Sequence, residues 1–381
     1  MTNEGKVQKI GIDVRLWNET GIGRYIRNLI FELVKIKNQY KYVLFASSVD
    51  VPEIKSLLQE SDAIDRFIII PTGIKWHSIQ EQIELPGILM KYQLDLMHFP
   101  YFSVPIFYRK KFVVTVHDLI INHFPTGRAT TLPSPLYKIK RLGYDFILRT
   151  AISNAAKIIA PSSATKHELL DHYQIKQDKV IVTQEGIDER INSFTPVVFK
   201  DKYPYFLYVG NVYPHKNIET LLEAFKVFTV QHPDVVMRLV GKEDYFYKRL
   251  KEYVVKHKIP CVEFAGYVSD ARLSNFYTHA VATVIPSLME GFGLTALEAM
   301  RMKSLVIASK IPSLEEVCGG NAIYFDPGDI LSIVDAMNVS LSIKKEDKEK
   351  RLIAAKKHSE TFTWEQMAKQ TVAVYDSCLK S

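Results

Sequence analysis

The feature that most constrains the fold is an alternation of short apolar runs with longer amphipathic segments, present in both halves of the chain. The short runs are rich in β-branched residues and too short for most helices, which indicates buried strands. Strands that alternate with helices form βα units around a parallel sheet. We predict strands at residues 10–14, 42–46, 67–70, 94–99, 112–116, 158–160 and 180–183, then at 205–209, 235–240, 262–264, 282–285, 305–308 and 322–325.

The length of 381 residues exceeds that of a typical single domain, so we expect two. Residues 194–204 contain two prolines and no clear periodicity, which is typical of a linker. Each half then holds its own doubly wound sheet. Because such sheets bind ligands outside the carboxyl ends of their strands, two sheets that face one another would place the site in the cleft between the domains.

The composition is that of a soluble globular protein, with 47% hydrophobic and 24% charged residues. The formal net charge of +7 suits anionic small molecules or an anionic membrane surface and is too weak to indicate nucleic acid. The three cysteines are widely separated, which favours a reducing compartment. Residues 1–9 lack an apolar signal region, and no run reaches the roughly 18 apolar residues of a membrane span. We therefore expect a cytoplasmic protein.

The stretch 286–300 combines a strand end, a glycine turn and a helix start. A helix N-terminus offers unpaired N–H groups to a phosphate, and glycines such as Gly291 and Gly293 let a ligand approach the backbone. Glu290 and Glu298 frame this turn and would be placed to accept hydrogen bonds from sugar and ribose hydroxyls. The alternative interpretation is a helix cap and a solvated surface residue.

Three other loops follow predicted strands. Gly21 and Gly23 open a helix, but the third glycine of a dinucleotide fingerprint is missing, so a nicotinamide-dependent oxidoreductase is disfavoured. His117 ends another strand, where it would bond a sugar hydroxyl or transfer a proton, or have a structural role. Gly210 precedes Lys216, which is placed to neutralise a diphosphate at the next helix start.

Two basic segments, 137–149 and 108–111, mix cations with apolar residues. They are the candidates for contact with anionic lipid or with an acceptor's phosphate, although a solvated helix face is the explanation that such segments favour. The chain contains no Asp-x-Asp pair of the kind that holds a nucleotide-sugar through a metal, so we expect no metal and no cofactor.

Taken together, these motifs resemble a family 4 glycosyltransferase, a retaining nucleotide-sugar enzyme of the GT-B fold. The resemblance covers nearly the whole chain, and its most specific element is the E-x7-E pattern of Glu290 and Glu298. The other matching segments are residues 21–25, 115–119, 160–163, 185–188, 208–210 with 216–217, 264–266, 286–287, 290–294, 297–299, 325–327 and 362–364.

The resemblance implies an α/β fold of two Rossmann-like domains facing an interdomain cleft. Residues 1–195 would bind the acceptor, residues 196–365 the nucleotide-sugar, and residues 366–381 would form a helix that packs back on the first domain.

It also implies the roles of individual residues. Glu290, His117 and Lys216 would be catalytic: Glu290 would contact the donor sugar, His117 would face it, and Lys216 would bind the diphosphate. Glu298 would bind the ribose. The complete predicted donor site is Gly21, Gly23, Gly210, Asn211, Lys216, Tyr267, Val268, Glu290, Gly291, Phe292, Gly293, Leu294 and Glu298. Asn211 stands where many members have Arg, and His215, Arg24 or Arg15 would have to compensate.

The glycine and Pro-His-Lys-Asn motifs are most similar to those of bacterial surface-polysaccharide mannosyltransferases. This favours transfer of mannose from GDP-mannose to a glycan or lipid-linked glycan, at the inner face of the cell membrane. The alternatives are a UDP-sugar donor, or a non-catalytic nucleotide-sugar-binding partner subunit.

Overall fold

The structure, a computed structural model, describes residues 7–60, 63–124, 134–187 and 202–380. The chain divides into two compact units. The first comprises residues 1–119, 132–186 and 364–381, and the second comprises residues 120–131 and 187–363.

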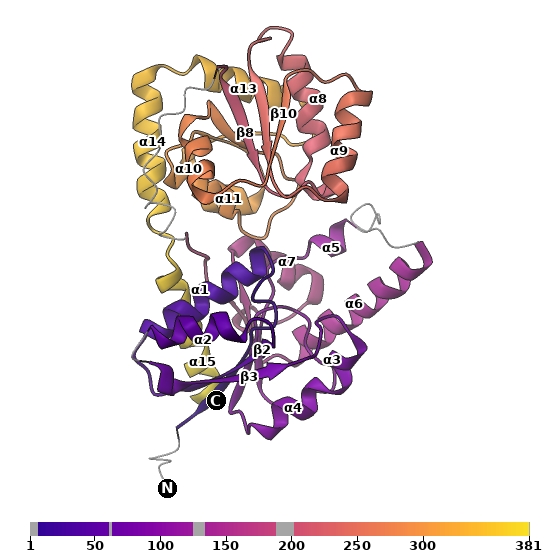
Figure 1. The fold of residues 1–381 in the computed structure, drawn as a ribbon, viewed down its shortest axis with the longest axis vertical. Coiled ribbons are helices and arrows are strands. Elements are labelled where there is room, and N and C mark those ends of the chain that lie inside the picture. Colours follow the sequence, from indigo (N-terminus) through magenta and orange to yellow (C-terminus); the bar gives the residue numbers. More distant parts are fainter. Residues whose placement is uncertain (1–6, 61–62, 125–133, 188–201, 381) are drawn as a thin grey trace. The chain divides into compact units, whose positions relative to one another are not determined.

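The first unit is built on a seven-stranded parallel sheet with the strand order β3-β2-β1-β4-β5-β6-β7 (Figure 1). Its strands are β1 (Lys9–Asp13), β2 (Lys41–Ser47), β3 (Phe67–Thr72), β4 (Leu96–Phe99), β5 (Phe112–Thr115), β6 (Lys157–Ala160) and β7 (Val180–Val182).

The second unit holds a six-stranded parallel sheet in the order β10-β9-β8-β11-β12-β13. Its strands are β8 (Tyr205–Val209), β9 (Val236–Val240), β10 (Val262–Gly266), β11 (Ala282–Ile285), β12 (Val306–Ser309) and β13 (Ala322–Phe325).

Helices connect the strands. In the first unit these are α1 (Gly21–Lys35), α2 (Val51–Gln59), α3 (Ile79–Ile83), α4 (Leu85–Lys91), α6 (Ser134–Asn154), α7 (Ser163–Tyr173) and α15 (Trp364–Lys380), with short 3-10 turns at Ile64–Arg66 and Gln177–Lys179. In the second they are α5 (Ile120–His123), α8 (Ile218–Phe228), α9 (Tyr245–Lys256), α10 (Asp270–His279), α11 (Leu294–Arg301), α12 (Pro312–Cys318), α13 (Ile330–Ser342) and α14 (Lys345–Ser359), with 3-10 turns at Pro214–Lys216 and Gly319–Asn321.

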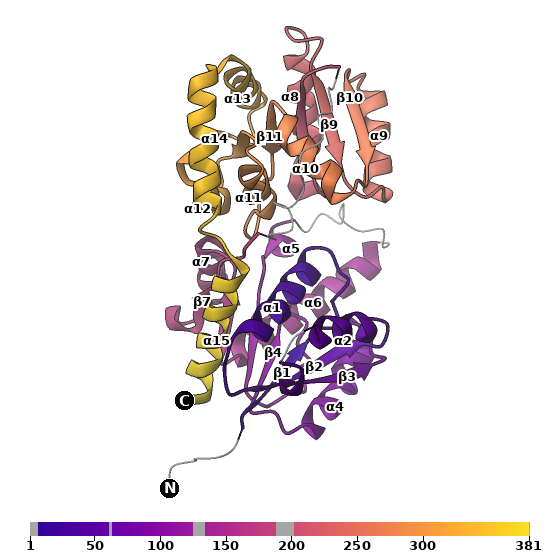
Figure 2. The ribbon, with the colours of Figure 1, turned by 60° about the vertical axis from the view of Figure 1, so that its left-hand side comes forward.

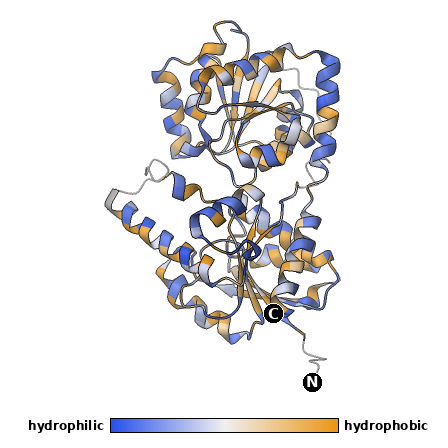
Figure 3. Cartoon of the chain, turned by 180° about the vertical axis from the view of Figure 1, so that it is seen from behind, coloured by the Kyte–Doolittle hydropathy of each residue, from blue (hydrophilic) through white to orange (hydrophobic). Residues whose placement is uncertain are grey.

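All thirteen predicted strands are present, within two residues at each end. They could be recognised because helices cover both faces of each sheet, so that strands such as β4, β5, β11 and β12 are buried along their whole length. Figure 3 shows the result as apolar strands inside each unit and helices with hydrophilic outer faces.

The predicted boundary between residues 195 and 196 lies outside the described residues. Of the described residues, 134–186 belong to the first unit, whereas 120–124 and 202–363 belong to the second. Most of the predicted linker, residues 194–201, lies outside the described residues. The last helix, α15, starts at Trp364 and belongs to the first unit (Figure 2).

Polar contacts attach α15 to the first sheet. The Tyr375 hydroxyl lies 2.6 Å from Nδ1 of the buried His98 on β4. Tyr40 donates a hydrogen bond to Asp376, and Lys111 donates one of 2.8 Å to the carbonyl of Cys378. His98 therefore serves to hold the C-terminal helix.

Among the described residues, no helix is both long enough and apolar enough to cross a membrane.

The two glycines at the start of α1 differ in what a side chain would meet, which gives a test of the fold. A Cβ on Gly23 would lie 2.5 Å from the Trp17 carbonyl oxygen and 2.7 Å from that of Leu16, whereas one on Gly21 would meet nothing within 4 Å. We expect Gly23→Ala to lower the free energy of unfolding by about 1–3 kcal/mol, because backbone must move.

The matched variant Gly21→Ala should leave stability unchanged within about 0.5 kcal/mol. Urea denaturation followed by circular dichroism measures both. Equal midpoints for the two variants would show that the close approach of α1 to residues 16–17 is wrong.

Candidate functional site

The strand order of each sheet marks the place where a ligand can bind. From β8 the second sheet grows through β9 and β10 on one side and through β11, β12 and β13 on the other. The loops after β8 and β11 therefore diverge, and they leave a crevice at the carboxyl ends of these two strands. The corresponding place in the first sheet is between β1 and β4.

In the second unit, an ion pair joins the two loops that flank this place. Lys216 follows β8 and Glu290 follows β11, and the Lys216 Nζ lies 2.7 Å from Glu290 Oε1. Both side chains are largely buried, at 19% and 13% exposure. The backbone N–H of Leu288 also donates a 2.8 Å hydrogen bond to the carbonyl of His215, so the loops are fixed to each other by main chain as well.

Glu290 is held as a carboxylate. The Ser287 hydroxyl donates a 2.6 Å hydrogen bond to the same Oε1 that Lys216 contacts. Burial raises the pKa of Glu290, but Lys216 and Ser287 outweigh burial and bring the pKa below its ordinary value. Both of these hydrogen bonds are made to Oε1 and not to Oε2.

Next to the ion pair, a glycine turn leads into α11. Gly293 has a φ of +118°, and a Cβ there would lie 2.8 Å from Leu314, so glycine is required. The carbonyl of Gly293 accepts hydrogen bonds from the N–H groups of Ala296 and Leu297. The N–H groups ahead of them lie at the start of α11, and a helix N-terminus of this kind can accept a phosphate.

The other residues of this turn lie where the sequence analysis placed them, between β11 and α11. Phe292 is buried at 4% exposure and its ring lies 5.9 Å from that of Phe362, so its contribution to a ligand is limited to its backbone. Leu294 begins α11, and Gly291 and Gly293 form the turn between Glu290 and this helix.

Glu298 is placed differently from Glu290. It lies in α11, is only 7% exposed, and accepts a 2.9 Å hydrogen bond from the Tyr277 hydroxyl on α10. The alternative interpretation of Glu298 as a solvated surface residue is therefore wrong. Tyr277, at 1% exposure, orients this carboxylate, and nothing in its sequence context indicated that.

The loop after β8 is also constrained. Gly210 has a φ of +142°, and its carbonyl accepts a 2.8 Å hydrogen bond from Tyr247. The Asn211 carbonyl accepts a hydrogen bond from the buried Tyr208, while the Asn211 side chain is exposed. These bonds position the loop backbone, and the Asn211 side chain carries no charge for a diphosphate.

Of the residues proposed to compensate for Asn211, two have no positive charge to offer a diphosphate, because one is neutral and the other is paired with carboxylates. Burial and the neighbouring Lys216 lower the pKa of His215 to about 4, so this side chain is neutral at pH 7. Arg15 belongs to the first unit and is committed to two carboxylates.

Tyr267 and Val268, predicted to belong to the donor site, follow β10, two strands away from β8 in the sheet. Tyr267 is 81% exposed, whereas Val268 is 8% exposed and belongs to the hydrophobic core. Only Tyr267 therefore has a side chain that a nucleotide base can contact.

In the first unit, His117 follows β5 and is held on both sides of its ring. Its Nδ1 lies 3.2 Å from Glu185 Oε1, and its Nε2 lies 3.0 Å from the carbonyl of Pro100, which follows β4. Both neighbours are acceptors, an arrangement that favours a proton on each nitrogen. Burial lowers the pKa of His117, but the hydrogen bond and charge of Glu185 outweigh burial, and the pKa is raised. The arrangement therefore favours the protonated, cationic form of His117 over the neutral form that a general base requires.

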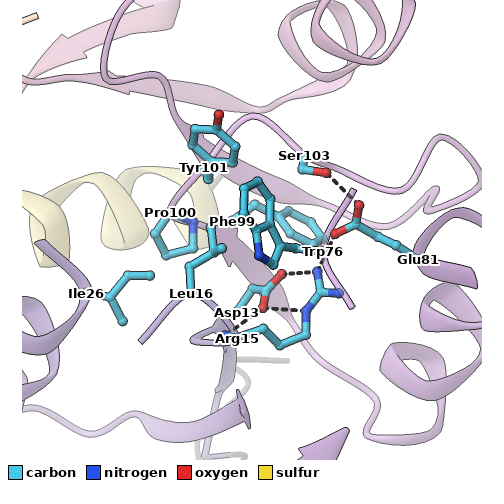
Figure 4. A pocket seen from close by; sticks show the side chains of 10 residues that line it. All are labelled: Asp13, Arg15, Leu16, Ile26, Trp76, Glu81, Phe99, Pro100, Tyr101 and Ser103. Atoms are coloured by element: carbon cyan, nitrogen blue, oxygen red, sulfur yellow. Dashed lines mark hydrogen bonds and ion pairs between the residues drawn. The ribbon is translucent and has the colours of Figure 1, made fainter. Parts of the chain in front are cut away.

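Figure 4 shows a buried charge network at the switch point of the first sheet, which sequence reasoning missed. Arg15 binds Asp13 through two hydrogen bonds of 2.8 and 2.6 Å and Glu81 through a third of 2.6 Å. Glu81, at 0% exposure, also accepts hydrogen bonds from the Ser103 hydroxyl and the His77 backbone. The network ties the loop before α3 to the ends of β1 and β4. The adjoining cavity, of about 10 Å³, has room for about one water molecule.

Within the described ranges, no group of three or more His, Cys, Asp or Glu side chains is arranged to hold a metal ion.

Two family models match the chain. Residues 20–190 match Glycosyltransferase Family 4, and residues 189–359 match Glycosyl transferases group 1. The change from one match to the other falls within a few residues of the end of the first unit at Gly186.

Curated relatives include O-antigen chain mannosyltransferase B from Escherichia coli, which is 26% identical over 384 residues that cover 93% of this chain and 96% of the relative. O-antigen chain mannosyltransferase RfbU from Salmonella typhimurium is 30% identical over 217 residues, or 57% of each chain. Among solved structures, Anabaena HepE in complex with UDP and glucose has a TM-score of 0.69 at 17% identity and covers 97% of this chain and 100% of that one. At this identity the likeness shows the fold, which is GT-B.

The His117–Glu185 pair gives a prediction on pH. In Glu185→Gln, burial is no longer opposed by the carboxylate, so the pKa of His117 should fall below its wild-type value. Proton NMR of the imidazole across a pH series measures this shift, with the exposed Glu60→Gln as the control that should leave it unchanged.

The free energy of unfolding that Glu185→Gln loses should depend on pH. A histidine whose pKa is raised on folding contributes stability that is fully present below its unfolded pKa near 6.5 and is lost as pH rises through the folded pKa. Glu185→Gln should therefore cost more stability at pH 6 than at pH 8.5. A larger cost at pH 8.5 would contradict the cationic state of His117.

Proposed function

Because the chain belongs to the family 4 glycosyltransferases, we propose that it is a retaining hexosyltransferase that moves mannose from GDP-mannose to a glycan or lipid-linked glycan in cell-envelope polysaccharide synthesis. The names of two relatives, both O-antigen chain mannosyltransferases, support the choice of sugar and of pathway.

The observation that carries this proposal is the Lys216–Glu290 pair beside the N-terminus of α11. Lys216 supplies one positive charge, and the helix end supplies N–H groups and a positive dipole. These groups suit a diphosphate. The Oε2 oxygen of Glu290 then accepts a hydrogen bond from a hydroxyl of the sugar attached to that diphosphate.

The reaction we propose is a displacement on one face of the sugar. The bond between the anomeric carbon and the diphosphate oxygen breaks, and the acceptor oxygen bonds to the same face. The leaving diphosphate takes the acceptor's proton, so no nucleophile or base of the protein is required. Catalysis then consists of positioning the donor and stabilising charge on the leaving group.

We propose the remaining donor contacts from the burial and hydrogen bonds of two residues in the second unit. Glu298, oriented by Tyr277, accepts hydrogen bonds from the ribose, and Tyr267 contacts the base. We propose that no metal is required, since Lys216 and the start of α11 provide the positive charge. For His117 we retain the proposed contact with the sugar, for which Nε2 would exchange its hydrogen bond to the Pro100 carbonyl for one to a sugar hydroxyl.

We further propose that the acceptor is met at the inner face of the cell membrane, through peripheral contact with anionic lipid. Nucleic acid is not a proposed partner.

A donor panel tests the proposed function. The purified protein is incubated with GDP-mannose, UDP-glucose or UDP-GlcNAc, with and without lipid extract, and release of nucleoside diphosphate is recorded. Release from GDP-mannose above the UDP-sugars is expected. Release from a UDP-sugar alone would correct the donor, and no release from any donor would favour the non-catalytic partner subunit.

Glu290→Gln tests the central residue with little change in shape. It removes the negative charge opposite Lys216, so we expect kcat to fall about 10²–10³-fold. The matched control is Glu243→Gln, which breaks an exposed ion pair to Lys251 in the same unit and should leave kcat unchanged. A Glu290→Gln enzyme with the wild-type kcat would exclude the proposed role of this carboxylate.

A further inference from the structure

Helix α6 presents apolar side chains to solvent on the face opposite the one that packs. Its inner face is buried through Leu148, Ala151 and Ile152. On the same side, the Tyr144 ring lies 4.6 Å from Phe102, edge to face. The helix is therefore attached to the first unit and does not need a second apolar face for its own stability.

Four large apolar residues nevertheless lie exposed along it. Leu136, Ile139, Leu142 and Phe146 have exposures of 55%, 67%, 70% and 59%, and we call them the apolar stripe. At 100° per residue they occupy an arc of about 120°, roughly opposite the packed face. Figure 3 shows apolar and hydrophilic segments alternating along α6.

Cations border the apolar stripe on both edges. On the same helical wheel, Lys138 and Arg149 lie along one edge and Lys140 along the other. Both lysines are exposed. The helix carries four basic residues and one acidic residue, Asp145, a net charge of +3. An apolar face flanked by Lys and Arg is the pattern of a helix that lies in a membrane interface.

The charges decide between two occupants of this face. In a symmetric pair of copies, each apolar stripe would meet the other with cations along every edge, and these would repel. An anionic bilayer instead offers acyl chains to the stripe and phosphates to the flanking lysines.

The position of α6 connects this surface with the carboxyl edge of the first sheet. Phe102, on which Tyr144 packs, lies in the loop that follows β4, three residues from the strand end. The second basic segment contributes less than its sequence indicated. Tyr108 is buried at 3% exposure, and Lys111 bonds to the Cys378 carbonyl.

We propose that α6 docks the first unit on an anionic lipid surface, with the apolar stripe entering the interface and Lys138 and Lys140 contacting lipid phosphates. The inference deepens the proposed function by naming the surface that brings the enzyme to a lipid-linked acceptor, and it rests on that function only for the identity of the acceptor.

Vesicle flotation of the full chain, without donor or acceptor, tests it. Wild-type protein should float with vesicles of phosphatidylcholine and phosphatidylglycerol and not with phosphatidylcholine alone. The double variant Leu142→Glu with Phe146→Glu should reduce the bound fraction roughly tenfold. The charge variant Lys138→Gln with Lys140→Gln should weaken binding and reduce its sensitivity to salt.

The control is Val255→Glu, an equally exposed apolar residue, at 78%, on α9 of the other unit, which should float like wild type. Circular dichroism of each variant checks that it is folded. Wild-type protein that does not float, or variants that float equally, would overturn the proposal, as would inorganic phosphate releasing the protein more effectively than sodium chloride of equal ionic strength, because that would indicate a discrete phosphate site and not a lipid surface. Loss of a solution dimer in the stripe variant, without vesicle binding, would assign the face to a second copy.

Failure of this inference and failure of the proposed function are separable. If the donor panel shows no turnover but the vesicles bind, α6 is a lipid-binding helix on a protein of another activity. If turnover with a water-soluble acceptor persists while vesicles do not bind, the proposed function is supported and the proposed docking surface is wrong.

Discussion

The candidate site of the second unit depends on one partly buried ion pair, Lys216 with Glu290. Lys216 and Glu290 lie on loops that follow the neighbouring strands β8 and β11, so each charge finds its partner on the other loop. Removing one partner of a buried pair leaves the other uncompensated, which is costly. The hydrogen bond from Leu288 to His215 keeps the backbones in register, and Ser287 holds the carboxylate. The pair thereby places a cation, an acceptor oxygen and a helix N-terminus at one strand edge.

A different arrangement of charges lies at the switch point of the first sheet. Arg15 is matched by Asp13 and Glu81, and Glu81 is further bonded by Ser103. A network in which each buried member has partners fixes the geometry of the surrounding loops. Because Arg15 is paired with the carboxylates of the network itself, the network supports the loops of the first unit and does not supply a cation for a phosphate.

Sequence reasoning succeeded where the physics is local or periodic. The strands were predictable because strands of a parallel sheet covered on both faces are apolar throughout. The location of Lys216, Glu290 and His117 was predictable because they lie in loops that follow such strands. Partners that lie far apart in the chain were not predictable. Glu81 is separated from Arg15 by 66 residues, and Glu185 from His117 by 68. No local pattern marks Tyr277 as the partner of Glu298, and the protonation of His117 follows only from its two acceptors.

Calorimetric titration of GDP and of UDP into wild-type protein and Lys216→Met tests most directly whether this ion pair is the donor site. Methionine keeps the length of the side chain but removes its charge, and Lys256→Met on the exposed end of α9 is the matched control. We predict that either GDP or UDP binds wild type and the control with the same affinity. The same nucleotide should bind Lys216→Met with a dissociation constant at least about tenfold higher, a loss of about 1.4 kcal/mol in binding free energy. Equal affinity for wild type and Lys216→Met would contradict the assignment of Lys216 and Glu290 as the donor site.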